Sequence, residues 1–296
     1  MTLRSARLLL FVALWYLYGV PVEAQESPKR YRIAACDWMM LKRQKLGVFA
    51  LAHEIGADGV ELDMGPLGKR LLFDNQLRDD QQAVKFLHKA DSFGIEVPSI
   101  AMSGFFAQNF LTRDNYQDLI HDCIATMRRF RAKVAFLPLG GSGNEWKRDG
   151  AQRNQMIKRL RVAGEMMCAA GFTLGIRTQL TAKENIQLLK QIGCPAVKLY
   201  YNFQDAADAG RDIPKELKKL GRNRIVQIHA SNTDSVNLRE DSEIDLPCIK
   251  QTLDKIGWHG WLVVERSRDT SRIRDVKYNF ERNVAYLKEV FQSDEK

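Results

Sequence analysis

Two short apolar segments near the carboxyl end of the sequence each stop at a side chain that can do chemistry. An Ile-Val-Gln-Ile segment ends at His229, and a Trp-Leu-Val-Val segment ends at Glu265. Buried parallel strands are near-continuous apolar runs, and the residues at their carboxyl ends face the loops that carry the chemistry of α/β folds. An imidazole can bind a metal or move a proton, and a carboxylate can act as a base. His229 and Glu265 are therefore the first site candidates.

A helix is expected between these two segments. Asp245 can cap its first turn, and Pro247 is suited to the first helical positions, where a missing N–H costs nothing. The stretch therefore has the order strand, helix, strand, which is the repeating unit of a parallel α/β fold.

The same alternation runs through the rest of the chain. Strands are expected at 31–36, 59–62, 95–101, 134–139, 172–176, 197–201, 225–229 and 261–264, with helices at 42–55, 80–93, 114–130, 151–170, 183–192, 214–220, after Asp245, and at 275–291. Eight such units in roughly 270 residues match a single-domain (β/α)8 barrel, whose typical size is about 250 residues. An open doubly wound sheet would normally show a glycine fingerprint after its first strand, and none is present.

The amino terminus resembles a secretory signal. Arg4 and Arg7 precede an apolar run over 8–20, and Val22 and Ala24 are small residues at the positions that a signal peptidase reads. We expect residues 1–24 to be a signal peptide and 25–296 to be a secreted or periplasmic protein without a stable membrane span. An uncleaved membrane anchor is the alternative, but the apolar run is short for a span.

The chain is basic, with a formal net charge of +9 that falls to +8 when the two Arg and one Glu of residues 1–24 are removed. Lys and Arg are spread over many expected helices and form no single block. We interpret most of this charge as solvated helix faces, so no nucleic acid partner is expected.

Polar side chains follow other expected strands as well. Glu61 is a second candidate for the catalytic base, and the candidates for substrate binding are Asp37, Arg177, Asn202 and Arg268. For Asp205, Arg266 and Arg268 a solvated or structural role is favoured, and Glu265 could simply pair with Arg177. The loop at 102–112 is rich in Phe and amides, so it could wall a polar pocket, although packing beneath a lid would give the same composition.

Three motifs in this order resemble the xylose-isomerase-like TIM barrels, the group that contains sugar phosphate isomerases and epimerases and the endonuclease IV type of DNA repair enzyme. The motifs are Gly-Ala-Asp-Gly-Val-Glu-Leu at 56–62, Gln-Ile-His at 227–229 and Gly-Trp-Leu-Val-Val-Glu at 260–265. The resemblance covers nearly all of the chain after residue 24.

The resemblance implies a divalent metal held by Glu, Asp, His and Glu after the fifth to eighth strands. Such oxygen and imidazole ligands suit Mn²⁺, Mg²⁺, Co²⁺ or Zn²⁺. In this chain His229 and Glu265 keep the last two positions, whereas Arg177 stands where the Glu is expected and Asn202 where the Asp is expected. Asn202 still offers a carbonyl oxygen, but Arg177 changes the local charge by two units, which argues against the usual four-ligand site.

The activity implied is proton transfer between adjacent sugar carbons through an enediolate. Glu265 or Glu61 would be the base, and Arg177 would stabilise the oxyanion or bind a carboxylate or phosphate of the substrate. The leading hypothesis is an isomerase, epimerase or lyase acting on a sugar, keto-sugar or sugar acid, and the alternative is a barrel that binds such a ligand without turnover. Export and the shortage of zinc ligands argue against a repair endonuclease.

Overall fold

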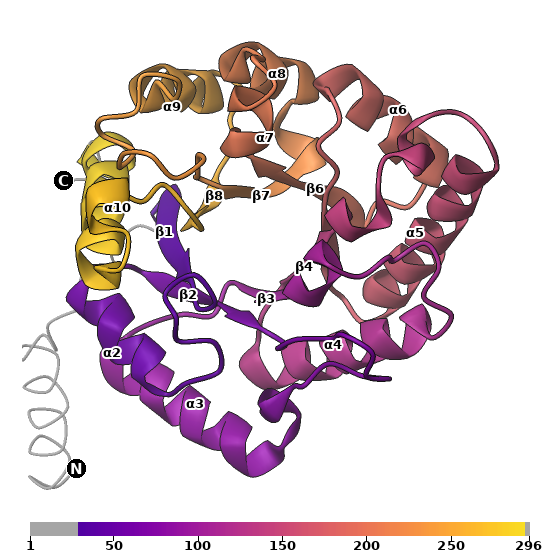
Figure 1. Ribbon diagram of the computed structural model, residues 1–296, viewed down its shortest axis with the longest axis horizontal. Coiled ribbons are helices and arrows are strands. Elements are labelled where there is room, and N and C mark those ends of the chain that lie inside the picture. The colour runs from indigo at the N-terminus through magenta and orange to yellow at the C-terminus, as the bar shows by residue number, and fades with distance from the viewer. Residues whose placement is uncertain (1–28, 294–296) are drawn as a thin grey trace, which may run out of the picture.

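The protein, described by a computed structural model over residues 29–293, is built around eight parallel strands that form a closed barrel (Figure 1). The strands are β1 (Tyr31–Cys36), β2 (Gly59–Asp63), β3 (Ser99–Ala101), β4 (Val134–Pro138), β5 (Thr173–Arg177), β6 (Val197–Asn202), β7 (Ile225–His229) and β8 (Gly260–Val264). They are hydrogen-bonded in sequence order, and β1 closes the ring by pairing with β8, Tyr31 opposite Gly260. The expected (β/α)8 barrel is confirmed.

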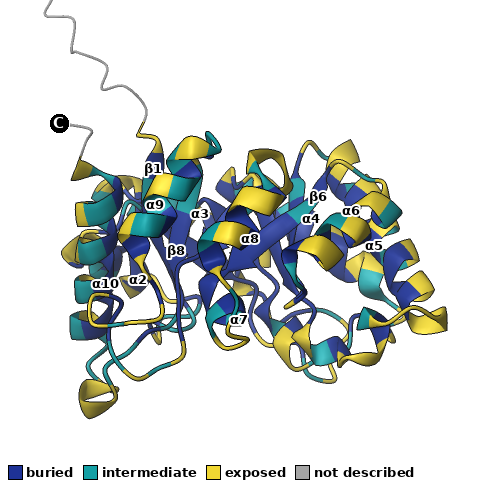
Figure 2. Ribbon diagram, turned by 90° about the horizontal axis from the view of Figure 1, so that it is seen from above, coloured by how far each residue is buried: buried dark blue, intermediate teal, exposed yellow. Residues whose placement is uncertain are grey.

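Helices surround the barrel on the outside (Figure 1). Within residues 29–293 they are α2 (Gly47–Glu54), α3 (Asp80–Phe93), α4 (Tyr116–Phe130), α5 (Ala151–Ala169), α6 (Ala182–Ile192), α7 (Phe203–Ala207), α8 (Ile213–Leu220), α9 (Leu246–Lys255) and α10 (Val276–Phe291). The strands in the centre are buried, and the helices turn their exposed sides outward (Figure 2). No helix in this part of the chain is both long enough and apolar enough to cross a membrane.

The ends of several helices follow from local chemistry. The carboxylate of Asp245 accepts a hydrogen bond from the Cys248 backbone N–H and caps α9, as expected. Gly94 ends α3 with φ of 64°, a left-handed conformation that suits glycine. These caps fix the position at which α9 begins and the position at which α3 ends.

Two expected elements were placed wrongly, and one element was missed. α2 starts at Gly47 and not at residue 42, because Leu41 and Gln44 have φ of 55° and 49°, which is incompatible with a right-handed helix. β3 is restricted to Ser99–Ala101. The short helix α7 was not expected, and it begins where the side chain of Asn202 accepts a hydrogen bond from the Gln204 backbone N–H.

Side chains alternate between two environments along the strands, as the pleat requires. In β1, Ala34 and Cys36 belong to the cluster inside the barrel, together with Phe136 and Tyr200, whereas Ile33 packs in the larger core between strands and helices. The small residues of β1 therefore pack with the aromatic residues of β4 and β6, and together they fill the interior of the barrel.

The expected signal peptide, residues 1–24, lies outside the described residues. The prediction that it is cleaved is therefore untouched by the structure, and the described chain begins only two residues before β1.

Candidate functional site

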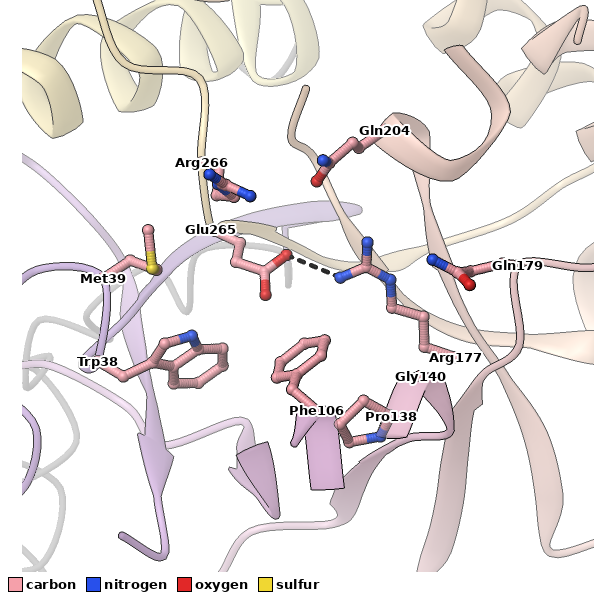
Figure 3. Close-up of a pocket in the computed structure, with 10 residues that line it drawn as sticks. All are labelled: Trp38, Met39, Phe106, Pro138, Gly140, Arg177, Gln179, Gln204, Glu265 and Arg266. Carbon is pink, nitrogen blue, oxygen red and sulfur yellow. Dashed lines mark hydrogen bonds and ion pairs between the residues drawn. The ribbon is translucent and has the colours of Figure 1, made fainter. Parts of the chain in front are cut away.

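A pocket of about 450 Å³ opens at the carboxyl end of the strands (Figure 3). It is lined by Trp38, Met39, Phe106, Pro138, Gly140, Arg177, Gln179, Gln204, Glu265 and Arg266. These residues come from the ends of β4 and β5, from α7 and from the loops that follow β1, β3, β4, β5 and β8. The pocket therefore occupies the end of a (β/α)8 barrel where such folds place their active sites.

Backbone strain is concentrated at the same end of the barrel. Of the five non-glycine residues with positive φ in the described chain, four lie in loops that follow β1, β5 or β8: Leu41, Gln44, Gln179 and Ser267. Gln179 lines the pocket itself, and Ser267 follows the lining residue Arg266. Strained backbone persists only where the surroundings enforce it, and it gathers at functional sites.

Glu265 holds one carboxylate oxygen in place and presents the other to the pocket. Its Oε2 accepts hydrogen bonds from Nη1 of Arg177 at 3.3 Å and from Nδ2 of Asn202 at 3.2 Å. Nδ1 of His229 lies 3.6 Å from the same oxygen. Oε1 accepts no hydrogen bond from residues 29–293, and it lies on the side of Trp38 and Phe106 (Figure 3). Glu265 is thus anchored by Oε2 and open to a ligand at Oε1.

Arg177 is held on its other edge by Asp205. Nε and Nη2 of Arg177 donate to the two carboxylate oxygens of Asp205 at 2.9 and 2.8 Å. Burial on its own lowers the pKa of Arg177, but the charges of Glu265 and Asp205 outweigh it, so the pKa is raised. A guanidinium has five N–H donors, and the three bonds to Asp205 and Glu265 leave two for a ligand.

Aromatic rings form the opposite wall. The ring of Phe106 lies 5.5 Å from the guanidinium carbon of Arg177, and Trp38 stacks on Phe136 with centroids 6.4 Å apart. Gln179 and Gln204 add amide groups at the side of the pocket near Arg177 (Figure 3). An aromatic wall facing hydrogen-bonding groups suits a sugar ring, which has apolar C–H surfaces and hydroxyl edges.

His229 lies beneath Glu265, inside the barrel. Its Nε2 is 2.9 Å from Oε1 of Glu61, and its Nδ1 is buried without a hydrogen-bond partner in the described chain. Tyr200 and Phe136 enclose the ring, with centroids at 4.4 and 4.7 Å. His229 is therefore fixed in orientation, with one nitrogen toward Glu61 and the other toward Glu265.

Glu61 was expected to reach the barrel mouth, and it does not line the pocket. It is fully buried, and its Oε2 accepts hydrogen bonds from the hydroxyls of Ser99 at 2.6 Å and Tyr200 at 2.7 Å. The reason is its position within β2, two residues before the strand ends, whereas Glu265 comes after the last residue of β8. Glu61 is therefore linked to the pocket residue Glu265 through His229.

Three other expected site residues take structural positions outside the pocket lining. Asp37 accepts hydrogen bonds from the backbone N–H groups of Gln44 and Asp63, which ties the first loop to β2. The side-chain oxygen of Asn202 caps α7 while its amide nitrogen holds Glu265. Arg268 binds Asp234 through Nε at 3.1 Å and Nη2 at 2.6 Å.

Asp37 and Asp63 form a fully buried pair of carboxyl groups. Burial and the charge of Asp63 raise the pKa of Asp37 well above its usual range. Burial also raises the pKa of Asp63 to about 6, although Arg43 lies 2.8 Å away as an ion-pair partner.

Several lining residues were not among the site candidates from the sequence: Trp38, Met39, Gln179 and Gln204. Arg266 was interpreted as solvated or structural, and it lines the pocket. Most of these lining residues follow a strand or a site candidate by one or two positions, which was the available signal. Phe106 fulfils the expectation that the loop at 102–112 could wall a pocket. Asp205 was interpreted as solvated or structural; it is structural, and its partner is Arg177.

The fold and the pocket at the carboxyl ends of its strands define the class of protein. The model of the family described as xylose isomerase-like TIM barrel matches residues 49–290. The chain belongs to this family, as the motifs at 56–62, 227–229 and 260–265 had indicated.

Known proteins of this fold include sugar epimerases. The structure of D-psicose 3-epimerase solved with D-fructose is similar, with a TM-score of 0.71, 11% identity, and coverage of 88% of this chain and 99% of that one. L-ribulose 3-epimerase has a TM-score of 0.68 with 15% identity, covering 89% and 95%. The 3-keto-D-glucoside 4-epimerase of E. coli has a TM-score of 0.66 with 13% identity, covering 88% and 99%. At these identities the likeness establishes the fold.

One curated relative is the rhizopine catabolism protein MocC of Rhizobium meliloti, which is 24% identical over 157 residues. The match covers 46% of this chain and 47% of the relative, so it spans about half of each protein.

The divalent metal that the resemblance implied does not fit the residues present. Arg177 occupies one ligand position with a positive charge, and the oxygen of Asn202 is used by the Gln204 N–H. In the described chain no group of three or more His, Cys, Asp and Glu side chains is arranged to hold a metal ion. Two unit charges about 4 Å apart interact by about 4 kcal/mol at an effective dielectric near 20, so Arg177 would oppose a bound cation.

Proposed function

We propose that the protein is a sugar isomerase-like or epimerase-like enzyme that moves a proton on a sugar, keto-sugar or sugar acid through an enediolate. The observation that carries the proposal is the position of Glu265, which is anchored through Oε2 and presents Oε1 to the pocket. Among the described residues that line the pocket, Glu265 is the one with a carboxylate.

The class of substrate is supported by the comparisons and by the size of the pocket. The similar structures are named for epimerases of D-psicose, L-ribulose and a 3-keto-D-glucoside. A volume of about 450 Å³ lies within the range of roughly 300–1,000 Å³ that small-molecule sites occupy. A monosaccharide-sized ligand packed on Phe106 and Trp38 would present its hydroxyls to Gln179, Gln204 and Arg177.

The proposed step uses two groups of the chain. Oε1 of Glu265 removes the proton from the carbon next to the carbonyl, and the electron pair of the broken C–H bond moves onto the carbonyl oxygen to give the enediolate. The free N–H donors of Arg177 stabilise the negative charge on that oxygen. The hydroxyl proton on the deprotonated carbon then moves to the former carbonyl oxygen, which shifts the negative charge to the oxygen of the deprotonated carbon. The protonated Glu265 returns its proton to the former carbonyl carbon, and the charged oxygen forms the new carbonyl at the deprotonated carbon.

A single carboxylate favours transfer on one face of the substrate. Because Glu265 is the base and also the acid, the proton returns from the side on which it left, which is what 1,2-isomerisation requires. Inversion at one carbon requires a second proton donor on the opposite face, and the opposite wall consists of Trp38 and Phe106, which carry no such group. Isomerisation, or elimination of a hydroxyl from the same enediolate, is therefore favoured over epimerisation.

Glu61 and His229 are proposed as positioning residues. The pair at 2.9 Å fixes the imidazole beneath Glu265, so the carboxylate keeps its place between His229, Asn202 and Arg177. Neither side chain lines the pocket, so neither touches the substrate.

A second candidate function is binding without turnover. It is favoured by one observation, the ion pair that Glu265 makes with Arg177, because the same pair would hold two side chains in place in a purely structural site. Export to the periplasm or the exterior, expected from residues 1–24, remains part of the proposal and is decided by sequencing the amino terminus of the native protein.

The two functions are separated by incubating the purified protein with a panel of aldoses, keto-sugars and sugar acids. Ligand binding is detected by thermal shift, and turnover is detected by NMR of the sugar pool. Turnover that Glu265→Gln abolishes supports the enzyme. Binding of a sugar with no turnover of any panel member supports the binding protein.

A further inference from the structure

Four consecutive strand ends converge on one oxygen atom. Arg177 ends β5, Asn202 ends β6 and His229 ends β7, and all three face Oε2 of Glu265 after β8, at 3.3, 3.2 and 3.6 Å. The centre of this group is therefore an ion pair between a guanidinium and a carboxylate, with an amide and an imidazole beside it.

The guanidinium is built into the site and is not a mobile surface group. The side chain of Arg177 is only 10% exposed, and Asp205, 9% exposed, binds it with two parallel hydrogen bonds. Two-point binding of this kind fixes the plane of the guanidinium. The plane is also covered by Phe106.

The amide of Asn202 is equally fixed. Its oxygen accepts from the backbone N–H of Gln204, so its nitrogen must be the atom that faces Glu265. A metal ion would need an oxygen at that place, and turning the amide over would leave the first turn of α7 without its cap.

We propose that Arg177, anchored by Asp205, is the resident cation of this site, and that it binds the carbonyl or enediolate oxygen of the ligand without a divalent ion. Asp205 is then a positioning residue, because it occupies one edge of the guanidinium. The bonds to Asp205 and Glu265 together leave two N–H donors for a ligand oxygen. The inference rests on the proposed function for the identity of the ligand. The statement about metal does not depend on any sugar.

The ligand class follows from this arrangement. A fixed planar donor beside a carboxylate base fits an α-hydroxycarbonyl compound, in which the carbonyl oxygen binds the guanidinium while the adjacent C–H faces Oε1 of Glu265. Keto-sugars and open-chain aldoses have this group, whereas alditols and methyl glycosides do not.

The first arm of the test measures metal directly, by titrating the chelator-treated protein with Mn²⁺ in a calorimeter. The unmodified protein should show no site tighter than about 1 mM. Arg177→Glu with Asn202→Asp restores the two carboxylates that the resemblance implied, and this double variant should bind Mn²⁺ at least about 100-fold more tightly, in a manner lost when His229→Ala is added. Arg148→Glu with Asn144→Asp is the matched control, because both residues are exposed and the charge change is the same.

The second arm of the test does not depend on building a metal site into the protein. Arg177→Lys keeps the charge but loses the two-point bond to Asp205. In the presence of chelator this variant should bind a keto-sugar at least about tenfold more weakly than the unmodified protein, while the affinity for the matching alditol changes little.

Stoichiometric Mn²⁺ binding at about micromolar affinity by the unmodified protein, lost in His229→Ala, overturns the inference whether or not a sugar is turned over. So does keto-sugar binding that is equal in Arg177→Lys and in the unmodified protein. If sugars neither bind nor react, yet the metal results are as expected, the statement about metal stands and the proposed function fails.

Discussion

The carboxylate of Asp205 binds Arg177 through both of its oxygens, at 2.9 and 2.8 Å, and thereby turns the remaining nitrogen of the guanidinium, Nη1, toward Glu265. One residue outside the pocket lining thus determines how two pocket residues meet. Because Asp205 follows β6 and Arg177 ends β5, the pair also ties two neighbouring strand ends together.

Asp205→Ala should destabilise the protein by roughly 3 kcal/mol, because it leaves an almost buried guanidinium with one partner fewer. In a double-mutant cycle with Arg177→Met, the coupling energy should be about 1.5–3 kcal/mol, as for hydrogen bonds to charged groups. Urea unfolding of the four proteins measures it. Glu54→Ala removes one partner of an exposed ion pair with Lys277 and should cost less than about 1 kcal/mol. A coupling energy indistinguishable from zero would show that Asp205 does not hold Arg177.

Glu265→Gln should reduce turnover by a factor of about 10²–10⁴, the usual contribution of a general base, while leaving the fold intact. The amide keeps the volume of the side chain and can still accept from Arg177. Circular dichroism and a melting curve give the control, together with Glu145→Gln, an exposed residue near the same mouth. A loss of stability beyond the roughly 0.5–3 kcal/mol usual for point changes would mean that Glu265 is chiefly structural.

The barrel was predictable because its signals are local and repeated. Apolar runs such as those ending at His229 and Glu265 mark strands, and Asp245 and Gly94 mark helix ends, so the alternation could be read without tertiary information. The closure of the barrel followed from the number of units.

The site was only partly predictable because depth and pairing are tertiary properties. Glu61 lies within β2, two residues before its end, and is buried inside the barrel, whereas Glu265 comes after the last residue of β8 and lies at the mouth. The partner of Arg177 could not be found from spacing, because Asp205 reaches it only through the unexpected helix α7.

The pair of buried carboxyl groups predicts a pH dependence of stability. The folded pKa of Asp63, about 6, lies above the value of about 3.9 expected for the unfolded chain. The folded state therefore binds the proton of Asp63 more tightly than the unfolded chain does. The resulting contribution of protonated Asp63 to the free energy of unfolding is fully present below about pH 4 and is lost as the pH rises through about 6. Asp37 shifts in the same direction, and Arg43 is the facing cation.

Asp63→Asn should remove this dependence. The difference in unfolding free energy between the unmodified protein and the variant should fall by up to about 3 kcal/mol between about pH 4 and pH 7. Asp149→Asn, whose side chain is 89% exposed, is the matched control and should follow the unmodified protein at every pH. Parallel curves for Asp63→Asn and the unmodified protein would contradict the prediction.

Phe106→Ala should weaken sugar binding about 5- to 20-fold, which corresponds to roughly 1–2 kcal/mol of lost contact with the ring. Because Phe106 is 37% exposed, the stability of the protein should change little. Calorimetric titration with the best ligand of the panel measures the effect. Leu71→Ala removes a more exposed apolar side chain, 78% exposed and absent from the pocket lining, and should leave the affinity unchanged. Equal losses in both variants would place the ligand elsewhere.

The most direct test of the central claim is solvent deuterium exchange, followed by NMR, with keto-sugars and aldoses incubated in D₂O with chelator present. We expect the unmodified protein to introduce deuterium at the carbon next to the carbonyl of at least one of these sugars, and Glu265→Gln to introduce none. Exchange that Glu265→Gln retains, or that appears only after Mn²⁺ is added, would contradict the account of Glu265 as the base and Arg177 as the resident cation.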